Sequence, residues 1–127
     1  MRIKQLILGA LLTIGIGPAQ AAGAVEAWSG GTGSEEREYL LSQSADASLK
    51  LEFATPSGDY LSNVRVTIRD TGGTVLVDMR TDGPLFFARL APGRYQLVAG
   101  TDTGGSQTQD IRIGARSRTA LVLRFRE

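Results

Sequence analysis

The most constraining feature of this sequence is a short turn between two stretches rich in apolar residues. Residues 85–90 and 94–99 each have the apolar and aromatic content of a β-strand, and Ala91-Pro92-Gly93 lies between them. Pro presets φ at the start of a tight turn, and Gly accepts the positive φ that often follows. The pattern predicts an antiparallel β-hairpin, in a chain that contains no His and no Cys.

The same kind of pattern continues along the chain after residue 47. Apolar residues alternate with polar ones, which is typical of strands with one buried and one wet face. Turn residues separate most of these strands at intervals of about 9–12 residues, a spacing typical of a sandwich or barrel. Seven strands are predicted, at residues 49–53, 64–68, 74–79, 85–90, 94–99, 107–113 and 119–125.

Seven strands with one wet face each bury their apolar sides only if two sheets pack face to face. We therefore predict an all-β fold, a seven-stranded antiparallel β-sandwich. Its inner faces are predicted to hold Leu49, Leu51, Phe53, Val64, Val66, Ile68, Val75, Val77, Phe87, Leu97, Ile111, Ile113, Leu121, Leu123 and Phe125. The pairs Leu76-Val77 and Phe86-Phe87 point to both faces of their strands, so these strands are expected to be central, or covered on one side by a helix.

The first 21 residues have the pattern of a cleavable signal peptide. Arg2 and Lys4 precede an apolar run at residues 6–16. Residues 18–21 then offer small side chains for cleavage after Ala21. The apolar run is much shorter than the ~20 residues that a membrane-spanning helix needs. We therefore expect an exported protein, periplasmic or secreted, whose mature chain does not insert stably into a membrane.

Two short segments separate this leader from the strands. Residues 22–33 are small and Gly-rich and are predicted to form a flexible lead-in. Trp28 within it either covers an apolar spot or binds a partner. Residues 34–45 are predicted to form a short helix with Ser34 as its N-cap, because acidic residues then occupy the first turn. The folded domain is therefore expected to comprise residues 34–127.

Charge and composition exclude several classes of function. Loss of the leader leaves 12 basic and 13 acidic side chains, so the chain has no general attraction for nucleic acid, and no such partner is expected. Without His or Cys there is no His-dependent triad, no imidazole or thiolate metal ligand and no thiolate nucleophile. We therefore predict a non-catalytic protein with no cofactor. A small hydrolase remains the enzymatic alternative.

Several segments together resemble a known family. Residues 64–68 (V-R-V-T-I) are followed by residues 81–83 (T-D-G) and by residues 90–97 (L-A-P-G-R-Y-Q-L). Over residues 48–126 the chain is similar to the carboxypeptidase regulatory-like domain, a transthyretin-like or prealbumin-like seven-stranded sandwich. It also resembles small exported proteins of Gram-negative bacteria that carry this domain alone. The resemblance implies a fold and a compartment but no reaction, because the domain is an accessory module in that family.

Three loops are expected to meet at one end of the sandwich, because successive strands run up and down. Loops on a rigid scaffold often bind ligands. We predict a ligand-binding loop end formed by Asp59, Tyr60, Asn63, Asp82, Asp102 and Thr103. An envelope glycan could stack on the tyrosine ring and bond to the polar groups, or the ring could close the end of the core. The carboxylates could instead hold Ca²⁺, although Asp is also a common turn residue.

Five arginines are concentrated on the last two predicted strands and the turn between them: Arg112, Arg116, Arg118, Arg124 and Arg126. Such a basic stripe could bind lipopolysaccharide or an acidic partner. Alternatively it is a solvated face, partly neutralised by the glutamates of the helix, or it protects an edge strand against aggregation. The function predicted from the sequence is therefore a binding or interaction module for an unknown protein or an envelope glycan.

Overall fold

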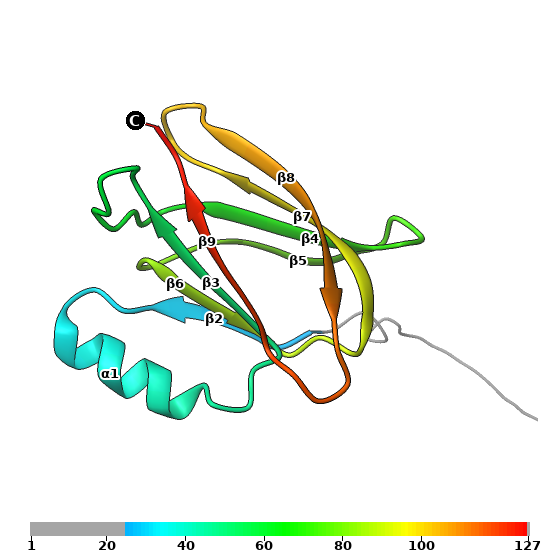
Figure 1. The fold of residues 1–127 in the computed structure, drawn as a ribbon. Helices are drawn as coiled ribbons and strands as arrows, with labels where there is room; N and C mark the ends of the chain where they lie inside the picture. Colours follow the sequence, from blue (N-terminus) through cyan, green and yellow to red (C-terminus); the bar gives the residue numbers. More distant parts are fainter. Residues whose placement is uncertain (1–24, 127) are drawn as a thin grey trace, which may run out of the picture.

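Eight strands form two sheets that pack face to face in the computed structural model, which describes residues 25–126 (Figure 1). The first sheet has the order β2-β6-β3-β9, formed by Ala27–Gly30, Leu85–Ala88, Leu49–Ala54 and Thr119–Arg124. The second has the order β5-β4-β7-β8, formed by Val75–Arg80, Arg65–Asp70, Gly93–Gly100 and Ser106–Ile113. Helix α1, Ser34–Gln43, lies outside the first sheet. The predicted signal peptide, residues 1–21, lies outside the described residues.

The predicted all-β sandwich is confirmed, with two corrections. The described residues contain eight strands rather than seven, because β2 forms within the segment predicted to be a flexible lead-in. This strand pairs antiparallel with β6, and Trp28 stacks on Phe87 with ring centroids 6.0 Å apart. In addition, β3 and β9 run parallel, with Leu51 opposite Leu121, so the sandwich is not wholly antiparallel.

The hairpin predicted around Pro92-Gly93 does not form. β6 ends at Ala88 in the first sheet and β7 begins at Gly93 in the second, so the chain crosses between the sheets here. Ser48 holds the start of this crossing, because its Oγ accepts the N–H of Leu90 at 2.8 Å and donates to the Leu90 carbonyl at 3.0 Å. The chain bends at Pro92, but the predicted pairing of the two strands on either side was wrong.

Hairpins form instead at two other glycine-containing turns. The connections at residues 71–74 and 101–105 join β4 to β5 and β7 to β8 as antiparallel neighbours. The turn at Gly83 instead carries the chain from the second sheet back to the first. A Cβ at this position would lie 2.3 Å from the carbonyl oxygen of Gly30, so the close approach of the two backbones requires glycine.

The core between the sheets contains most of the predicted inner residues: Leu49, Leu51, Phe53, Val64, Val66, Ile68, Val77, Leu97, Ile111, Ile113, Leu123 and Phe125. Leu121 is partly buried against it. Two assignments were wrong. Val75 is 46% exposed, because β5 is an edge strand with a register shift at this point. Phe87 is buried on the other side of its sheet, and Phe86 occupies the core instead.

β6 is apolar on both sides and lies between β2 and β3. On its outer side Leu85 and Phe87 are buried with Ala47, and Trp28 and Leu40 of α1 pack against them. The prediction that this strand is central, or covered by the helix, is therefore confirmed in both respects. The same prediction for the strand at residues 74–79 is wrong, because this segment forms β5, an edge strand of the second sheet.

Helix α1 lies close to its predicted range, but Gly33 rather than Ser34 is its N-cap, and no side chain caps it. Its first turn is tied to the end of β2. The carboxylate of Glu36 accepts the N–H of Gly31 at 3.1 Å, and Arg37 donates to the Gly31 carbonyl at 3.1 Å. No helix within residues 25–126 is long and apolar enough to cross a membrane.

Candidate functional site

The loops that follow β3, β5 and β7 reach the same end of the sandwich, as predicted. Arg65 at the start of β4 lies opposite both Arg80 and Gly100, which end β5 and β7. Glu52 near the end of β3 lies opposite Leu85, which begins β6. The six residues predicted to bind a ligand therefore share one end of the fold. Their contacts nevertheless divide them into separate groups.

Asn63 and Asp102 form one group together with Arg80. The side-chain amide of Asn63 donates to the Asp102 carboxylate, and Arg80 pairs with the same carboxylate at 3.1 Å. Asn63 adopts a φ of 59°, a left-handed conformation that asparagine tolerates better than most residues. Because an arginine already neutralises Asp102, this carboxylate is a poor ligand for a cation.

Asp59 and Asp82 lie in two further loops that hydrogen bonds from their backbone N–H groups help to hold. The N–H of Asp59 donates to Oγ1 of Thr55 at 3.1 Å, and its carboxylate accepts from Ser57 at 3.4 Å. The N–H of Asp82 donates to Oγ of Ser29 at 2.8 Å, which ties the crossing between β5 and β6 to β2. Within residues 25–126 no three acidic side chains converge to hold a metal ion, so the Ca²⁺ alternative finds no ligand set there.

The other two predicted residues lie in further separate contacts. Tyr60 is 49% exposed, so it does not close the core, and the guanidinium of Arg37 lies 4.7 Å from its ring centroid. Oγ1 of Thr103 and Oγ1 of Thr101 lie 3.1 Å apart and share a hydrogen bond. The loop end is thus a set of separate polar clusters rather than one converging site.

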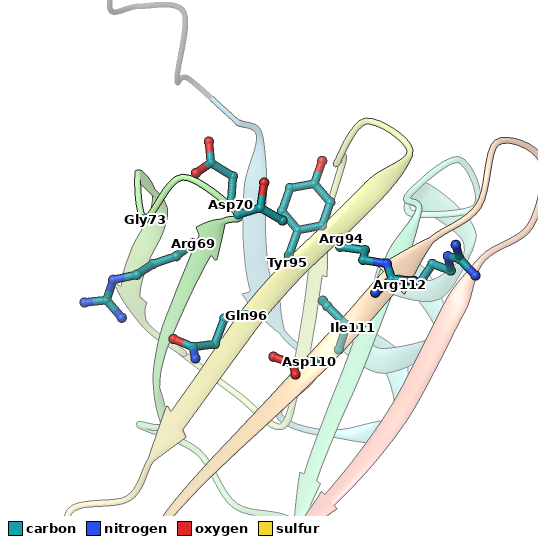
Figure 2. Close-up of a pocket in the computed structure, with 10 residues that line it drawn as sticks. Arg69, Asp70, Gly73, Arg94, Tyr95, Gln96, Asp110, Ile111 and Arg112 are labelled. Atoms are coloured by element: carbon teal, nitrogen blue, oxygen red, sulfur yellow. The ribbon is translucent and has the colours of Figure 1, made fainter.

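A groove of about 660 Å³ lies on the outer face of the second sheet, beside the turn between β4 and β5 (Figure 2). Its volume is in the range of small-molecule sites, roughly 300–1,000 Å³. The residues that give it its chemistry are Arg69, Asp70, Arg94, Gln96, Asp110 and Arg112. They come from three neighbouring strands, so the groove is built on a rigid part of the fold.

Strand register sets the arrangement of these side chains. Arg69 lies opposite Gln96, and Gln96 lies opposite Asp110, so they form one row across β4, β7 and β8. Arg94 lies directly opposite Arg112 in the next row of the same face. In Figure 2, Arg94 and Arg112 extend to the same side and Arg69 to the opposite side. Gln96 therefore lies between Arg69 and Asp110, and Asp110 lies on the edge strand β8, two residues from Arg112.

The opposed arginines are the distinctive electrostatic feature of the groove. Like charges directly opposite each other destabilise a sheet. No carboxylate of residues 25–126 lies within the 4.0 Å ion-pair distance of Arg94 or Arg112. On the same face, by contrast, Arg65 pairs with Asp78 at 2.9 Å. The described part of the protein thus leaves this local positive charge without an ion-pair partner.

Hydrogen bonds fix the end of the groove next to the turn. Oδ1 of Asp70 accepts the N–H groups of Gly72 and Thr74, each at 2.9 Å. The Tyr95 ring is buried below the groove, and its hydroxyl donates to the Ala91 carbonyl at 2.6 Å. Burial, and secondarily the charge of Asp70, raise the pKa of Tyr95, so this phenol stays neutral.

The predicted basic stripe contributes one residue to the groove, Arg112. Arg118 and Arg124 instead donate to backbone carbonyls, at 3.1 and 3.2 Å. No ion pair among the described residues joins the stripe to the helix glutamates, so the predicted neutralisation is not found. The sequence reasoning missed Arg69 and Arg94. Alternation indicates that both face outward, but only the register reveals which residues lie opposite them.

The side chains of the groove offer both donors and acceptors of hydrogen bonds. Its guanidinium groups act only as hydrogen-bond donors, and its carboxylates act as acceptors. Thr71 and Tyr95 also line the groove. An anion that also carries hydroxyl groups would satisfy both kinds of side chain.

Comparisons with known proteins supply no function. No family model matches the chain, and no curated protein matches it. Among solved structures, the chain is similar to the major pilin subunit of Bacillus cereus, with a TM-score of 0.47 and 11% sequence identity. This match covers 62% of the chain and 29% of the pilin subunit, so the chain spans less than a third of that protein. So weak a similarity carries no argument, and the sandwich architecture rests on the two sheets themselves.

Proposed function

We propose that the protein is an exported, non-catalytic β-sandwich module that binds its ligand in the groove on β4, β7 and β8. The leader-like pattern of residues 1–21 supports export to the periplasm or beyond. The motif at residues 90–97, together with the two-sheet fold, supports the finer assignment to the carboxypeptidase regulatory-like domains. That family resemblance implies an accessory module and no reaction.

The observation that carries the proposal is the opposed pair of Arg94 and Arg112. Two guanidinium groups in adjacent positions repel each other and so destabilise the free protein. An anion bound between them relieves this repulsion and accepts charge-assisted hydrogen bonds from both. The arrangement is unfavourable for the empty sheet and favourable for a complex, as expected of a binding site.

Residue composition supports binding over catalysis. The chain has no His and no Cys, and a single Lys follows the predicted leader. That residue, Lys50, lies on β3 in the first sheet, whereas the groove is on the second. This composition disfavours the His-dependent, Cys-dependent and Ser-Lys mechanisms of the small-hydrolase alternative.

The loop end is the competing location for a glycan. The exposed ring of Tyr60 favours it, because aromatic rings present a flat apolar surface for stacking. Arg37 already lies over that ring, however, and Asp102 is already paired with Arg80. Within residues 25–126, by contrast, Arg69, Arg94 and Arg112 of the groove make no ion pair, and we therefore place the ligand there.

A glycan-binding screen followed by NMR titration tests this proposal. ¹⁵N-labelled protein is titrated with each peptidoglycan, lipopolysaccharide or capsular fragment that the screen identifies. We expect the amides of residues 94–96 and 110–112 to shift, and the double variant R94Q/R112Q to lose binding. The matched loop-end variant Y60A/D82A should bind normally. Loss of binding only in Y60A/D82A would show that the groove is the wrong site, and turnover of the ligand would contradict a non-catalytic role.

A further inference from the structure

We infer that the groove binds an anionic saccharide, a sugar that carries a phosphate, sulfate or carboxylate group. The anion would lie between Arg94 and Arg112, and sugar hydroxyls would bond to Gln96 and Asp110. This inference rests on the proposed function, because it names the class of ligand for the same groove.

The geometry of the two arginines defines the anion subsite. Directly opposed residues on an antiparallel pair have Cβ atoms about 5 Å apart. Arg94 and Arg112 occupy such positions, and in Figure 2 both extend in the same direction. Each guanidinium is a planar fork of donors that matches the oxygens of a carboxylate, phosphate or sulfate. Two forks from adjacent strands can therefore hold one oxyanion.

The neighbouring row defines what else the ligand must carry. Asp110 lies two residues from Arg112 on β8, hence on the same face and about 7 Å along the strand. Gln96 lies directly opposite Asp110. A carboxylate accepts hydrogen bonds from hydroxyls, and the glutamine amide both donates and accepts. The ligand thus needs hydroxyl groups close to its charged group, as a substituted sugar ring has.

The same residues disfavour other anions. Asp110, two residues from Arg112 on β8, would repel the continuous negative charge of a nucleic acid or an anionic membrane. After loss of the leader, the chain also has no excess of basic residues to attract such a surface. A free phosphate or sulfate ion satisfies the arginines but offers no sugar hydroxyl to Gln96 and Asp110. These alternatives become outcomes of the test.

Arg69 extends the site at the far end of the row. It faces Gln96 from β4, and within residues 25–126 it makes no ion pair. A second anionic group, on the next sugar of a chain, would lie on this side of the groove. We therefore expect a charged oligosaccharide to bind more tightly than a charged monosaccharide.

NMR titrations with defined probes test the inference. The anionic saccharides are trigalacturonic acid, glucose 6-phosphate and glucose 6-sulfate, which differ in the anion. Maltotriose is the neutral sugar, inorganic phosphate the sugar-free anion, and a short DNA oligomer the polyanion. We expect each anionic saccharide to shift the amides of residues 94–96 and 110–112, and to bind about tenfold more tightly than maltotriose, inorganic phosphate or DNA.

Variants on the same face separate the site from general charge. R94Q/R112Q should weaken binding of the anionic saccharides about tenfold or more, because two charge-assisted contacts are lost. R94K/R112K keeps the charge but loses the planar forks, so a several-fold loss is expected. The matched control is R65Q, which removes an arginine that Asp78 pairs on the same face, and binding should stay within about twofold. D110N should reduce the preference for sugars over inorganic phosphate.

Each contrary result overturns a defined part of the argument. Equal affinity for inorganic phosphate and the anionic sugars would exclude a saccharide site, and equal affinity for maltotriose would exclude the role of the anion. A response to DNA alone would assign the groove to nucleic acid. If the groove binds a ligand of another class and none of these probes, the saccharide inference fails while the proposed function stands. Shifts confined to the loop end would contradict both.

Discussion

The two sheets differ sharply in how they use their outer faces. On the first sheet, Leu85 and Phe87 are at most 2% exposed, because α1 and Trp28 cover them. On the second sheet the outer face is charged and carries the groove with Arg94 and Arg112. A strand that is apolar at successive positions needs cover on both sides, whereas alternating strands leave one face open to a ligand. The first outer face contributes stability and the second is available for binding.

Arginines show the same contrast. On the covered side Arg89 lies 4.8 Å from the Trp28 ring and Arg118 lies 5.9 Å from the Phe87 ring, while the two rings stack on each other. Arg89 also pairs with Asp46 at 3.0 Å. These cations therefore have protein partners, whereas the opposed arginines of the groove have no ion-pair partner among the described residues. One residue type thus supports the fold on one face and, in our proposal, binds a ligand on the other.

The largest expected loss of stability comes from removing a buried side chain on the outer face of the first sheet. Phe87→Ala should lower the free energy of unfolding by about 3–5 kcal/mol, because it removes a fully buried ring from beneath Trp28. On the open face, Val98 occupies an outward position of β7 and is only partly buried, so Val98→Ala should cost less than about 1 kcal/mol. Urea denaturation of both variants measures the difference. Similar losses at the two positions would show that the faces are not distinct in stability.

Much of the fold could be predicted from local sequence, and its strand pairing could not. Alternation identifies the strands, and the Phe86-Phe87 pair indicates a doubly covered strand. The failure at residues 91–93 has a physical cause: a Pro-Gly sequence is compatible either with a hairpin or with a crossing between sheets. Ser48, 42 residues from Leu90, takes part in deciding between them through hydrogen bonds. Such distant contacts carry no local signal.

The candidate site was harder to predict than the fold. Alternation places Arg94 and Arg112 on outward faces of their strands, but their opposition follows from the register of β7 and β8. The polar loop residues were predicted to bind a ligand because such residue types commonly do so. In the structure most of them bond to neighbouring groups of the protein, as the Asp59 carboxylate does with the Ser57 hydroxyl. Composition alone does not distinguish a satisfied polar group from one available to a ligand.

An intermediate loss of stability should come from breaking the hydrogen bond that anchors Trp28 on the outer face of the first sheet. Nε1 of Trp28 donates to Oγ of the fully buried Ser44 at 2.7 Å. Ser44→Ala should lower the free energy of unfolding by about 1–3 kcal/mol, since it leaves the indole N–H without this partner. In a double-mutant cycle with Trp28→Phe, the two effects should be less than additive. Full additivity would mean that the bond does not hold β2 and the end of α1 together.

A smaller effect of opposite sign is expected on the open face. Arg94→Gln removes the repulsion with Arg112 and should raise the free energy of unfolding by about 0.2–1 kcal/mol at low ionic strength. Salt screens exposed charges, so the gain should shrink in 1 M NaCl. The control Arg65→Gln, which breaks the pair with Asp78, should not stabilise the protein. A destabilised Arg94→Gln variant would mean that the opposed arginines are not strained in the free protein.

The smallest effect should be a pH dependence that both outer faces share. Hydrogen bonds from Arg89 and Arg65 lower the pKa values of Asp46 and Asp78, respectively, below their usual value of 3.8. A carboxyl whose pKa is lowered by folding contributes stability above its unfolded pKa and loses it as the pH falls through the folded pKa. Melting temperatures should therefore be flat between pH 7 and about pH 5 and fall below about pH 4. The double variant D46N/D78N should start lower at pH 7 and fall less steeply. Equal slopes in the two proteins would show that neither exposed pair contributes to stability, and that the two faces differ only in their apolar cover and in the opposed arginines.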